Sequence, residues 1–309
     1  MHLMYFTEQP MSAYPEQAGR DFGATALMFS NKHFDPVEGS RLYNNYIEQY
    51  MLAEEVGVDG IMLNEHHNAP FCMQAKANIF AALLAGMTKK VKIVMLGNPL
   101  PLAENPVRLA EELAMIDMIS KGRLVSGFVR GGGQEQLATG VNPAFNRERF
   151  EEAHDLVTRA WTQTGPFRFE GTHYQHRVVN PWAVPLQKPY PPIWVGGESG
   201  PALRRTARIG DAWYPIGTNP ANPLDSLARF KTQVARLRKM TAEAGRDPKS
   251  MGLAFRCTAL GESVPPKAGD GERRLFSGKP AEIAADMRAL RDMGVGSLDF
   301  GFGGETVEA

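Results

Sequence analysis

Short apolar runs alternate with helix-like segments along the whole chain, and this alternation constrains the fold more than any other feature. The eight runs cover 3–7, 60–65, 91–96, 123–129, 192–196, 211–216, 252–258 and 297–301. Between them, apolar residues recur every three to four positions, as expected of helices. The predicted helices cover 42–56, 75–88, 106–119, 148–162, 201–209, 224–243 and 280–293. Alternating strands and helices predict an α/β fold with a parallel sheet, and eight such units favour a (β/α)8 TIM barrel with insertions.

An open doubly wound sheet is the alternative arrangement of parallel strands and helices. Such sheets usually carry a glycine-rich fingerprint directly after the first strand. Here Gln9-Pro10-Met11-Ser12 follows the first run, and no glycine lies among these four residues. The sequence therefore favours the closed barrel.

Two segments interrupt the alternation of strands and helices. We expect one barrel domain over residues 1–309, with a loop insertion at 9–39 after the first strand and a β excursion at 166–191. A long loop at the carboxyl end of a barrel is usually functional, so the first insertion is expected to shape substrate specificity. Only residues 302–309 follow the last run, so the last barrel helix is expected to be missing.

Composition excludes several classes of function. Lysine plus arginine and aspartate plus glutamate each number 34, so the net charge is zero and nothing indicates a nucleic-acid or polybasic membrane-binding surface. Cys72 and Cys257 are the only cysteines, too few for a disulfide framework. The sequence contains no 18-residue apolar stretch and no signal-like N-terminus, so we expect a cytoplasmic protein that does not enter membranes.

The second run ends in Glu65-His66-His67. Adjacent strand residues point to opposite faces, so Glu65 and His67 share one face and His66 has the other. An imidazole titrates near neutral pH and can transfer protons or bind a cofactor, which makes His66 the candidate catalytic residue. A solvated histidine without a role is the alternative that this segment leaves open.

Two further strand ends carry residues suited to ligands. Gly97 and Asn98 follow the third run, where a glycine permits close approach of a flat ligand or simply makes a turn. Arg130 follows the fourth run and precedes three glycines. A guanidinium beside exposed backbone N–H groups suits a phosphate, although neither common phosphate-loop motif is present.

The fifth run leads through Glu198 and Ser199 into a predicted helix. Free N–H groups at a helix start attract anions, while a serine there also serves as an ordinary N-cap. Arg147 and Arg149 open another predicted helix and are either anion ligands or solvated charges.

The sequence gives little support for a metal site or for serine-hydrolase chemistry. Glu65-His66-His67 cannot place three ligands on one side of a strand, and the sequence contains no HExxH or CxxC motif. A GxSxG elbow is also missing. We therefore expect no metal site.

Five segments together resemble the bacterial luciferase-like flavin monooxygenases over nearly the whole chain. They are GVDGIMLNEHHN at 57–68, NPLPLAENPVRLAEELAMIDMISKGRL at 98–124, GFVRGG at 127–132, NRERFEEAHDLV at 146–157 and KPYPPIWVGGES at 188–199. Each motif alone is modest, but their joint order and spacing are specific. The fold of that family is a (β/α)8 barrel with insertions, which agrees with the independent strand count.

The resemblance implies roles for three residues near the flavin ring. His66 matches the active-site histidine beside the C4a and N5 edge of the flavin. Gly97 and Asn98 match the bulge after the third strand, often a non-prolyl cis peptide, which lies against the isoalloxazine ring.

The resemblance also implies a phosphate site. Arg130 falls on the arginine that the luciferases use near the flavin phosphate, and Glu198 and Ser199 match the strand end where a serine meets that phosphate. Arg147 and Arg149 remain rival phosphate ligands, because predicted helix starts can be wrong by a turn.

By resemblance, the protein is a two-component monooxygenase. It would take reduced FMN from a separate flavin reductase, and O2 would add at C4a to form a peroxyflavin that oxidises a small, largely apolar substrate. A homodimer through helices near the second and third strands is also implied. A deazaflavin (F420)-dependent oxidoreductase and a non-catalytic flavin-binding partner subunit are the alternatives.

Overall fold

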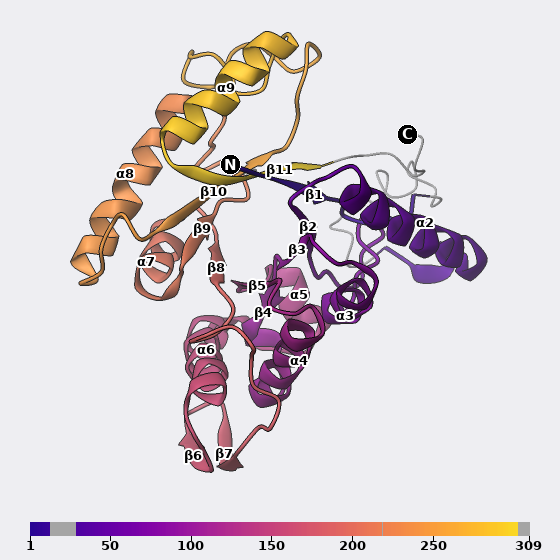
Figure 1. Ribbon diagram of the computed structural model, residues 1–309, viewed down its shortest axis with the longest axis vertical. Helices are drawn as coiled ribbons and strands as arrows, with labels where there is room; N and C mark the ends of the chain where they lie inside the picture. The colour runs from indigo at the N-terminus through magenta and orange to yellow at the C-terminus, as the bar shows by residue number, and fades with distance from the viewer. Residues whose placement is uncertain (13–28, 218, 302–309) are drawn as a thin grey trace. The chain divides into compact units, whose positions relative to one another are not determined.

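The chain contains two compact units (Figure 1). In the computed structural model, residues 1–12, 29–217 and 219–301 are described. Unit 1 comprises 1–6, 58–60 and 192–302, and unit 2 comprises 7–57, 61–191 and 303–309. Both units consist of parallel strands that alternate with helices, as the apolar runs predict.

The described part of unit 1 contains five parallel strands in the order β1-β11-β10-β9-β8. Their bounds are β1 (His2–Phe6), β8 (Ile193–Gly196), β9 (Ala212–Tyr214), β10 (Gly252–Cys257) and β11 (Val295–Gly301). The register places Met4 beside Asp299, and Asp299 beside Arg256. Side chains at paired positions of parallel neighbours share a face, so these three residues lie on one side of the sheet.

Three helices cover the other side of that sheet: α7 (Gly200–Ile209), α8 (Leu227–Glu243) and α9 (Pro280–Asp292). The core between helices and strands includes Trp213, Phe230, Phe255 and Leu298. The rings of Trp213 and Phe230 stack at 5.8 Å. Burial of large apolar side chains is the main force that holds the helices on this face of the sheet.

Within its described residues, unit 2 contains the remaining parallel strands and five α-helices. The strands are β2 (Gly60–Leu63), β3 (Lys92–Met95), β4 (Asn98–Pro99) and β5 (Leu124–Val129). The helices are α2 (Pro36–Glu55), α3 (Ala77–Met87), α4 (Pro106–Ile119), α5 (Gly133–Ala138) and α6 (Asn146–Thr162), and three short 3-10 helices cover Asn31–His33, Leu100–Leu102 and Pro143–Phe145. Because β3 and β4 both pair with β5, β4 continues the line of β3, and the two together count as one strand position. The eight predicted runs therefore correspond to eight strand positions in the described chain.

Helix α2 begins six residues earlier than the apolar periodicity predicts. Asp35 accepts hydrogen bonds from the backbone N–H groups of Val37 and Glu38, and Pro36 occupies the first helical position. An aspartate N-cap followed by proline is a strong helix start, which the apolar pattern alone does not register.

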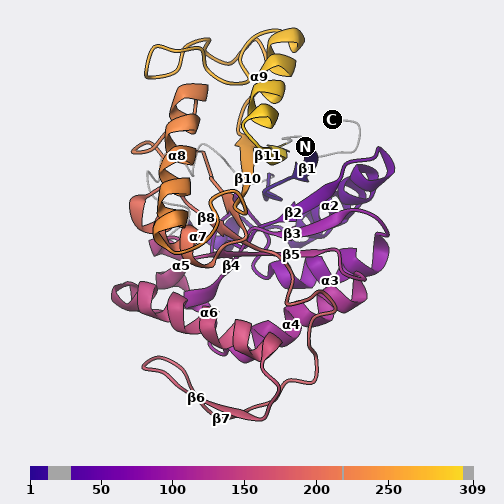
Figure 2. The ribbon, with the colours of Figure 1, turned by 60° about the vertical axis from the view of Figure 1, so that its left-hand side comes forward.

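An antiparallel hairpin of β6 (Phe167–Glu170) and β7 (Gln175–Val179) projects from the helices of unit 2 (Figure 2). Glu152 on α6 accepts hydrogen bonds from the backbone N–H groups of Thr172, His173 and Tyr174 at the hairpin turn. One carboxylate thus fixes the position of the turn on α6.

The prediction of one domain over 1–309 remains a prediction.

Two predictions concern residues outside the described part of the chain. The loop insertion at 9–39 includes residues 13–28, and the expected loss of the last barrel helix concerns 302–309. Within the described residues, no helix is long and apolar enough to span a membrane.

Gly127 on β5 permits the close approach of β3. A Cβ atom at this position would lie 1.7 Å from the carbonyl oxygen of Met95. We expect Gly127→Ala to lower the free energy of unfolding by about 2–3 kcal/mol, because backbone atoms must move apart. Gly86→Ala is the matched control: Gly86 is exposed on α3 with open space around it, so a change of about 1 kcal/mol or less is expected. Urea denaturation measures both, and equal stabilities of the two variants would contradict this account.

Candidate active site

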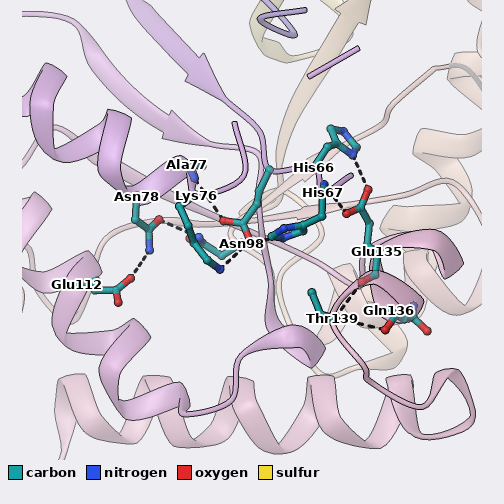
Figure 3. A network of polar contacts seen from close by, with 11 residues as sticks. His66, His67, Lys76, Ala77, Asn78, Asn98, Glu112, Glu135, Gln136 and Thr139 are labelled. Carbon is teal, nitrogen blue, oxygen red and sulfur yellow. Dashed lines mark hydrogen bonds and ion pairs between the residues drawn. The ribbon is translucent and has the colours of Figure 1, made fainter. Parts of the chain in front are cut away.

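His66 follows the end of β2 and is held by a buried glutamate of α5 (Figure 3). Its Nδ1 lies 2.9 Å from Oε1 of Glu135. The Glu135 side chain is 3% exposed, whereas the His66 side chain is 30% exposed. A buried carboxylate thus fixes the ring while part of the imidazole remains accessible.

The second oxygen of Glu135 holds the backbone of the same segment. Oε2 accepts a hydrogen bond of 2.8 Å from the N–H of His67. Burial by itself would raise the pKa of Glu135, but the hydrogen bonds from His66 and His67 outweigh it and hold the pKa below its usual value. The carboxylate is therefore ionised at neutral pH.

The ionised carboxylate also determines the tautomer of the neutral histidine. Because a carboxylate only accepts hydrogen bonds, Nδ1 of His66 carries the hydrogen in this pair. Nε2 is then the acceptor nitrogen of the neutral ring, 3.9 Å from Oε2 of Glu8. An imidazole with one nitrogen fixed and the other able to take a proton has the arrangement of a general base.

The side chain of His67 points away from this pair and contacts Glu65 instead. Its Nε2 lies 3.2 Å from Oε1 of Glu65, and Oε2 of Glu65 accepts from the N–H of Ala77 at the start of α3. Glu65 and His67 thus lie together while His66 has its own partner, as strand alternation predicts. We infer that Glu65 and His67 fix the position of the segment that carries His66.

A cavity of about 580 Å³ lies beside His66 within unit 2. Its described lining is mainly apolar and aromatic, and includes Met11, Phe34, Tyr43, Cys72 and Met73. No Asp, Glu, Lys or Arg occurs among those described lining residues. Burial raises the pKa of the Cys72 thiol to about 12, so this side chain is neutral as well. The cavity suits an uncharged, apolar ligand.

Gly97 and Asn98 lie where β3 gives way to β4. The peptide bond between Leu96 and Gly97 is cis. Asn98 is buried, and its Nδ2 donates to Oδ1 of Asn78 at 2.8 Å (Figure 3). Oδ1 of Asn98 has no hydrogen-bond partner among the described residues. Asn98 therefore offers one buried carbonyl oxygen that a ligand donor would satisfy.

Asn146 links the backbone segments that carry Arg130 and Arg147. Arg130 directly follows β5, and its backbone carbonyl accepts a hydrogen bond of 3.0 Å from Nδ2 of Asn146, the first residue of α6. Arg147 is the next residue, and both arginines are exposed. Neither guanidinium has a hydrogen bond or an ion pair within the described residues, so both can bind an anion.

Arg149 is committed to the protein itself. Its Nε donates to the carbonyl of Pro101 at 2.8 Å, and Nη2 donates to the carbonyl of Ala103 at 3.3 Å. The guanidinium also lies 4.8 Å from the ring centroid of Tyr174. Of the two rival phosphate ligands, Arg147 is thus the one with no donor engaged among the described residues.

Glu198 and Ser199 belong to unit 1, whereas the other candidate residues belong to unit 2. Oγ of Ser199 accepts from the N–H of Ala202 and caps α7. Glu198 is buried, and its Oε1 accepts a hydrogen bond of 2.8 Å from the N–H of Gly217. Both side chains stabilise local backbone, and their predicted contact with a phosphate remains a prediction.

Glu135 is the functional candidate that sequence reasoning missed. It lies five residues after Arg130 in the glycine-rich segment GGGQEQLATG, and α5 has only six residues, too few for apolar periodicity. The signal in the sequence that could have pointed to Glu135 is a carboxylate a few residues after the end of a barrel strand.

No group of three or more His, Cys, Asp or Glu side chains among the described residues could hold a metal ion.

The low pKa of Glu135 predicts a pH dependence of stability. A carboxyl group whose pKa is lower in the folded than in the unfolded state stabilises the fold. This contribution is complete when the pH is above the unfolded pKa near 4.5, and it is lost as the pH falls through the folded pKa. We expect Glu135→Gln to cost about 1–3 kcal/mol of unfolding free energy at neutral pH, and progressively less below about pH 4.5. Urea denaturation across pH measures this, with exposed Glu55→Gln as the control that changes little. A cost that is constant with pH would contradict the assignment.

Comparison with known proteins gives the family. The family model described as luciferase-like monooxygenase matches residues 25–263. The oxygenase component of a flavin-dependent trigonelline monooxygenase from Acinetobacter baylyi is 32% identical over 161 residues, which cover 51% of this chain and 44% of that protein. The matched segments span between 44% and 66% of the length of three curated relatives.

Solved structures give the fold. Monooxygenase RslO1 from Streptomyces bottropensis matches with a TM-score of 0.70 and 20% identity over 99% of this chain and 94% of that chain. An F420-dependent secondary alcohol dehydrogenase, solved with an F420–acetone adduct, matches with a TM-score of 0.65 and 18% identity over 87% and 89% of the two chains. The oxygenating constituent of 3,6-diketocamphane monooxygenase from Pseudomonas putida, solved with FMN, matches with a TM-score of 0.58 and 19% identity over 71% and 64%.

These likenesses, together with the eight parallel strand positions, confirm the predicted (β/α)8 barrel. The match to the family model covers more than half of the chain, including the segment that carries His66, Arg130 and Glu135. The chain therefore belongs to the luciferase-like monooxygenase family.

Proposed function

We propose that this protein is the oxygenase of a two-component flavin-dependent monooxygenase. It would use reduced FMN from a separate flavin reductase, together with O2, to oxidise a small and largely apolar substrate. The observation that supports this most is His66, held at Nδ1 by the buried carboxylate of Glu135 at the wall of an apolar cavity. The trigonelline monooxygenase relative, named as an oxygenase component, supports the need for a partner reductase.

The chemistry of the available groups fits FMN. Arg130 and Arg147 are cations with free donors, as a phosphate requires. Asn98 has a buried carbonyl oxygen without a described partner, which suits an N–H group of a ring. When bound, the reduced flavin supplies the activation of O2 and the transfer of oxygen.

The residues of this chain would supply orientation, proton handling and exclusion of water. His66 would accept or return a proton at Nε2 beside the reacting atoms, while Glu135 keeps the ring in one tautomer and one orientation. The apolar wall that includes Phe34 and Met73 would keep water from the reactive edge.

F420-dependent hydride transfer is the second candidate for the same site. The F420-dependent alcohol dehydrogenase has a higher TM-score than the FMN-bound monooxygenase, so the fold alone favours neither cofactor. Titration with reduced FMN and with reduced F420 distinguishes them. Tight and selective binding of F420 would contradict the monooxygenase proposal.

We also propose that the protein is a cytoplasmic homodimer. Large apolar side chains remain exposed on α3 and α4, which pack against each other: Ile79, Leu83, Met87, Met115, Met118 and Ile119. Exposed large apolar side chains on two helices that pack against each other are typical of a subunit interface.

Charged substitutions on that surface are expected to produce monomers. Leu83→Glu and Met115→Glu would place carboxylates in an apolar interface, so each should shift the sedimentation coefficient from dimer to monomer. Val178→Glu, on the exposed face of the β7 hairpin strand, is the matched control and should leave the coefficient unchanged. A wild-type protein that sediments as a monomer would contradict the proposal.

His66→Ala is expected to keep the fold but lower product formation by about 100-fold or more, because general acid–base catalysis contributes at least that much. The assay supplies reduced FMN through a flavin reductase and tests aldehydes, ketones and aromatic compounds, with product mass as the readout. His176→Ala, on the β7 strand of the hairpin, is the control and should retain activity. Unchanged product formation by His66→Ala would remove this residue from the mechanism.

A further inference from the structure

The cavity beside His66 has a lining of distinctive chemistry, and its described lining residues all belong to unit 2. Five of them carry rings, among them Phe29, Phe34 and Tyr43, and three carry sulfur, among them Met11 and Met73. No valine, leucine or isoleucine occurs among the described lining residues. Rings and polarisable sulfur atoms make specific contacts with an aromatic ligand, in addition to the apolar area that they bury. The lining therefore favours an aromatic ligand over an aliphatic one.

Contacts within unit 2 hold several of these rings in place. The rings of Phe29 and His33 stack, with centroids 5.0 Å apart and an angle of 13° between the ring planes. The ring of Tyr43 lies 5.6 Å from that of Phe80, and its hydroxyl donates to the carbonyl of Met73 at 2.6 Å. Because these neighbours fix the rings, a ligand meets aromatic surfaces that are already arranged before it binds.

The position of Phe34 depends on a glycine of α2. A Cβ atom on Gly39 would lie 2.5 Å from Cζ of Phe34, so a larger residue at this position would displace the ring. Gly39 is a buried residue of α2, and a glycine within a helix is less favourable than an alanine. An unfavourable helix residue at this point is explained by the room that it leaves for an aromatic side chain at the cavity wall.

His66 gives this cavity a hydrogen-bond acceptor. Nδ1 carries the hydrogen that binds the buried Glu135, so Nε2 of the neutral ring accepts hydrogen bonds. Its distance of 3.9 Å from Oε2 of Glu8 is longer than a hydrogen bond. A ligand that donates a hydrogen bond therefore matches His66, whereas a hydrocarbon leaves Nε2 without a partner.

We propose that the cavity binds an uncharged aromatic compound with a hydroxyl group, a phenol, and that this hydroxyl donates a hydrogen bond to Nε2 of His66. The inference rests on the proposed function, for which the phenol is the substrate, and it narrows the substrate class from small apolar compounds to phenols. His66 then orients the aromatic ring through its hydroxyl and can accept the proton of that hydroxyl. A charged compound is disfavoured, because no Asp, Glu, Lys or Arg occurs among the described lining residues.

Three probes with the same carbon skeleton separate the hydroxyl from the aromatic ring: thymol, para-cymene, which lacks the hydroxyl, and menthol, in which the ring is saturated. Calorimetry measures their affinities for the purified protein without added flavin. Thymol should bind about tenfold more tightly than menthol. The preference for thymol over para-cymene should be about tenfold larger in the wild type than in His66→Ala, because the variant lacks the acceptor. His33→Ala, which changes another histidine of the lining, is the matched control: it should weaken both probes alike and keep their ratio.

Gly39→Ala tests the aromatic wall without changing a lining residue. The added methyl group displaces the Phe34 ring, so the affinity for thymol should fall about fivefold while the protein remains folded. Gly86→Ala, on α3 with open space around the added Cβ, is the matched control and should bind thymol as the wild type does.

Nitrogen NMR of the wild type makes the test independent of whether the His66→Ala variant folds. The Nε2 resonance of His66 should shift on addition of thymol and stay in place on addition of para-cymene, because only thymol donates a hydrogen bond.

Three results on the wild type would each overturn the inference: binding of none of the probes, equal affinities for menthol and thymol, or an Nε2 resonance that saturating thymol leaves unchanged. A wild-type preference for thymol over para-cymene that persists in a folded His66→Ala variant would also overturn it. These measurements need no flavin, so they are independent of the cofactor. Protein that binds thymol as expected but does not bind reduced FMN would contradict the proposed function alone.

Discussion

The candidate active site depends on the two oxygens of one buried carboxylate. Glu135 binds the ring of His66 with one oxygen and the backbone N–H of His67 with the other. These contacts outweigh the cost of burying the charge, so the carboxylate stays ionised and the imidazole has a single orientation. Without Glu135, the loop after β2 would lose the contact that joins it to α5.

The same principle explains why the pKa values of two buried carboxyl groups of this chain shift in opposite directions. Glu135 accepts hydrogen bonds at both oxygens from near neighbours, and its pKa is lowered. Asp299 has one donor on Oδ2 and a distant guanidinium, and burial raises its pKa to about 7. Burial favours the neutral acid in both places, and the number of close donors decides whether the pKa falls or rises.

The sequence predicts the strands and the strand-end residues well, because apolar runs and their terminal polar residues are local signals. It does not predict Glu135, since the contact with His66 spans 69 positions and α5 is too short for periodicity. It also leaves Arg147 and Arg149 equivalent. Only tertiary structure distinguishes them, because the carbonyls of Pro101 and Ala103 accept hydrogen bonds from Nε and Nη2 of Arg149.

A double-mutant cycle on product formation tests the central claim, that Glu135 acts through His66. The rates of the wild type, Glu135→Gln, His66→Ala and the double variant are compared under the same supply of reduced FMN. If the two residues act as one unit, the double variant should be no slower than His66→Ala alone. Rate losses that multiply in the double variant would show independent roles and contradict the account.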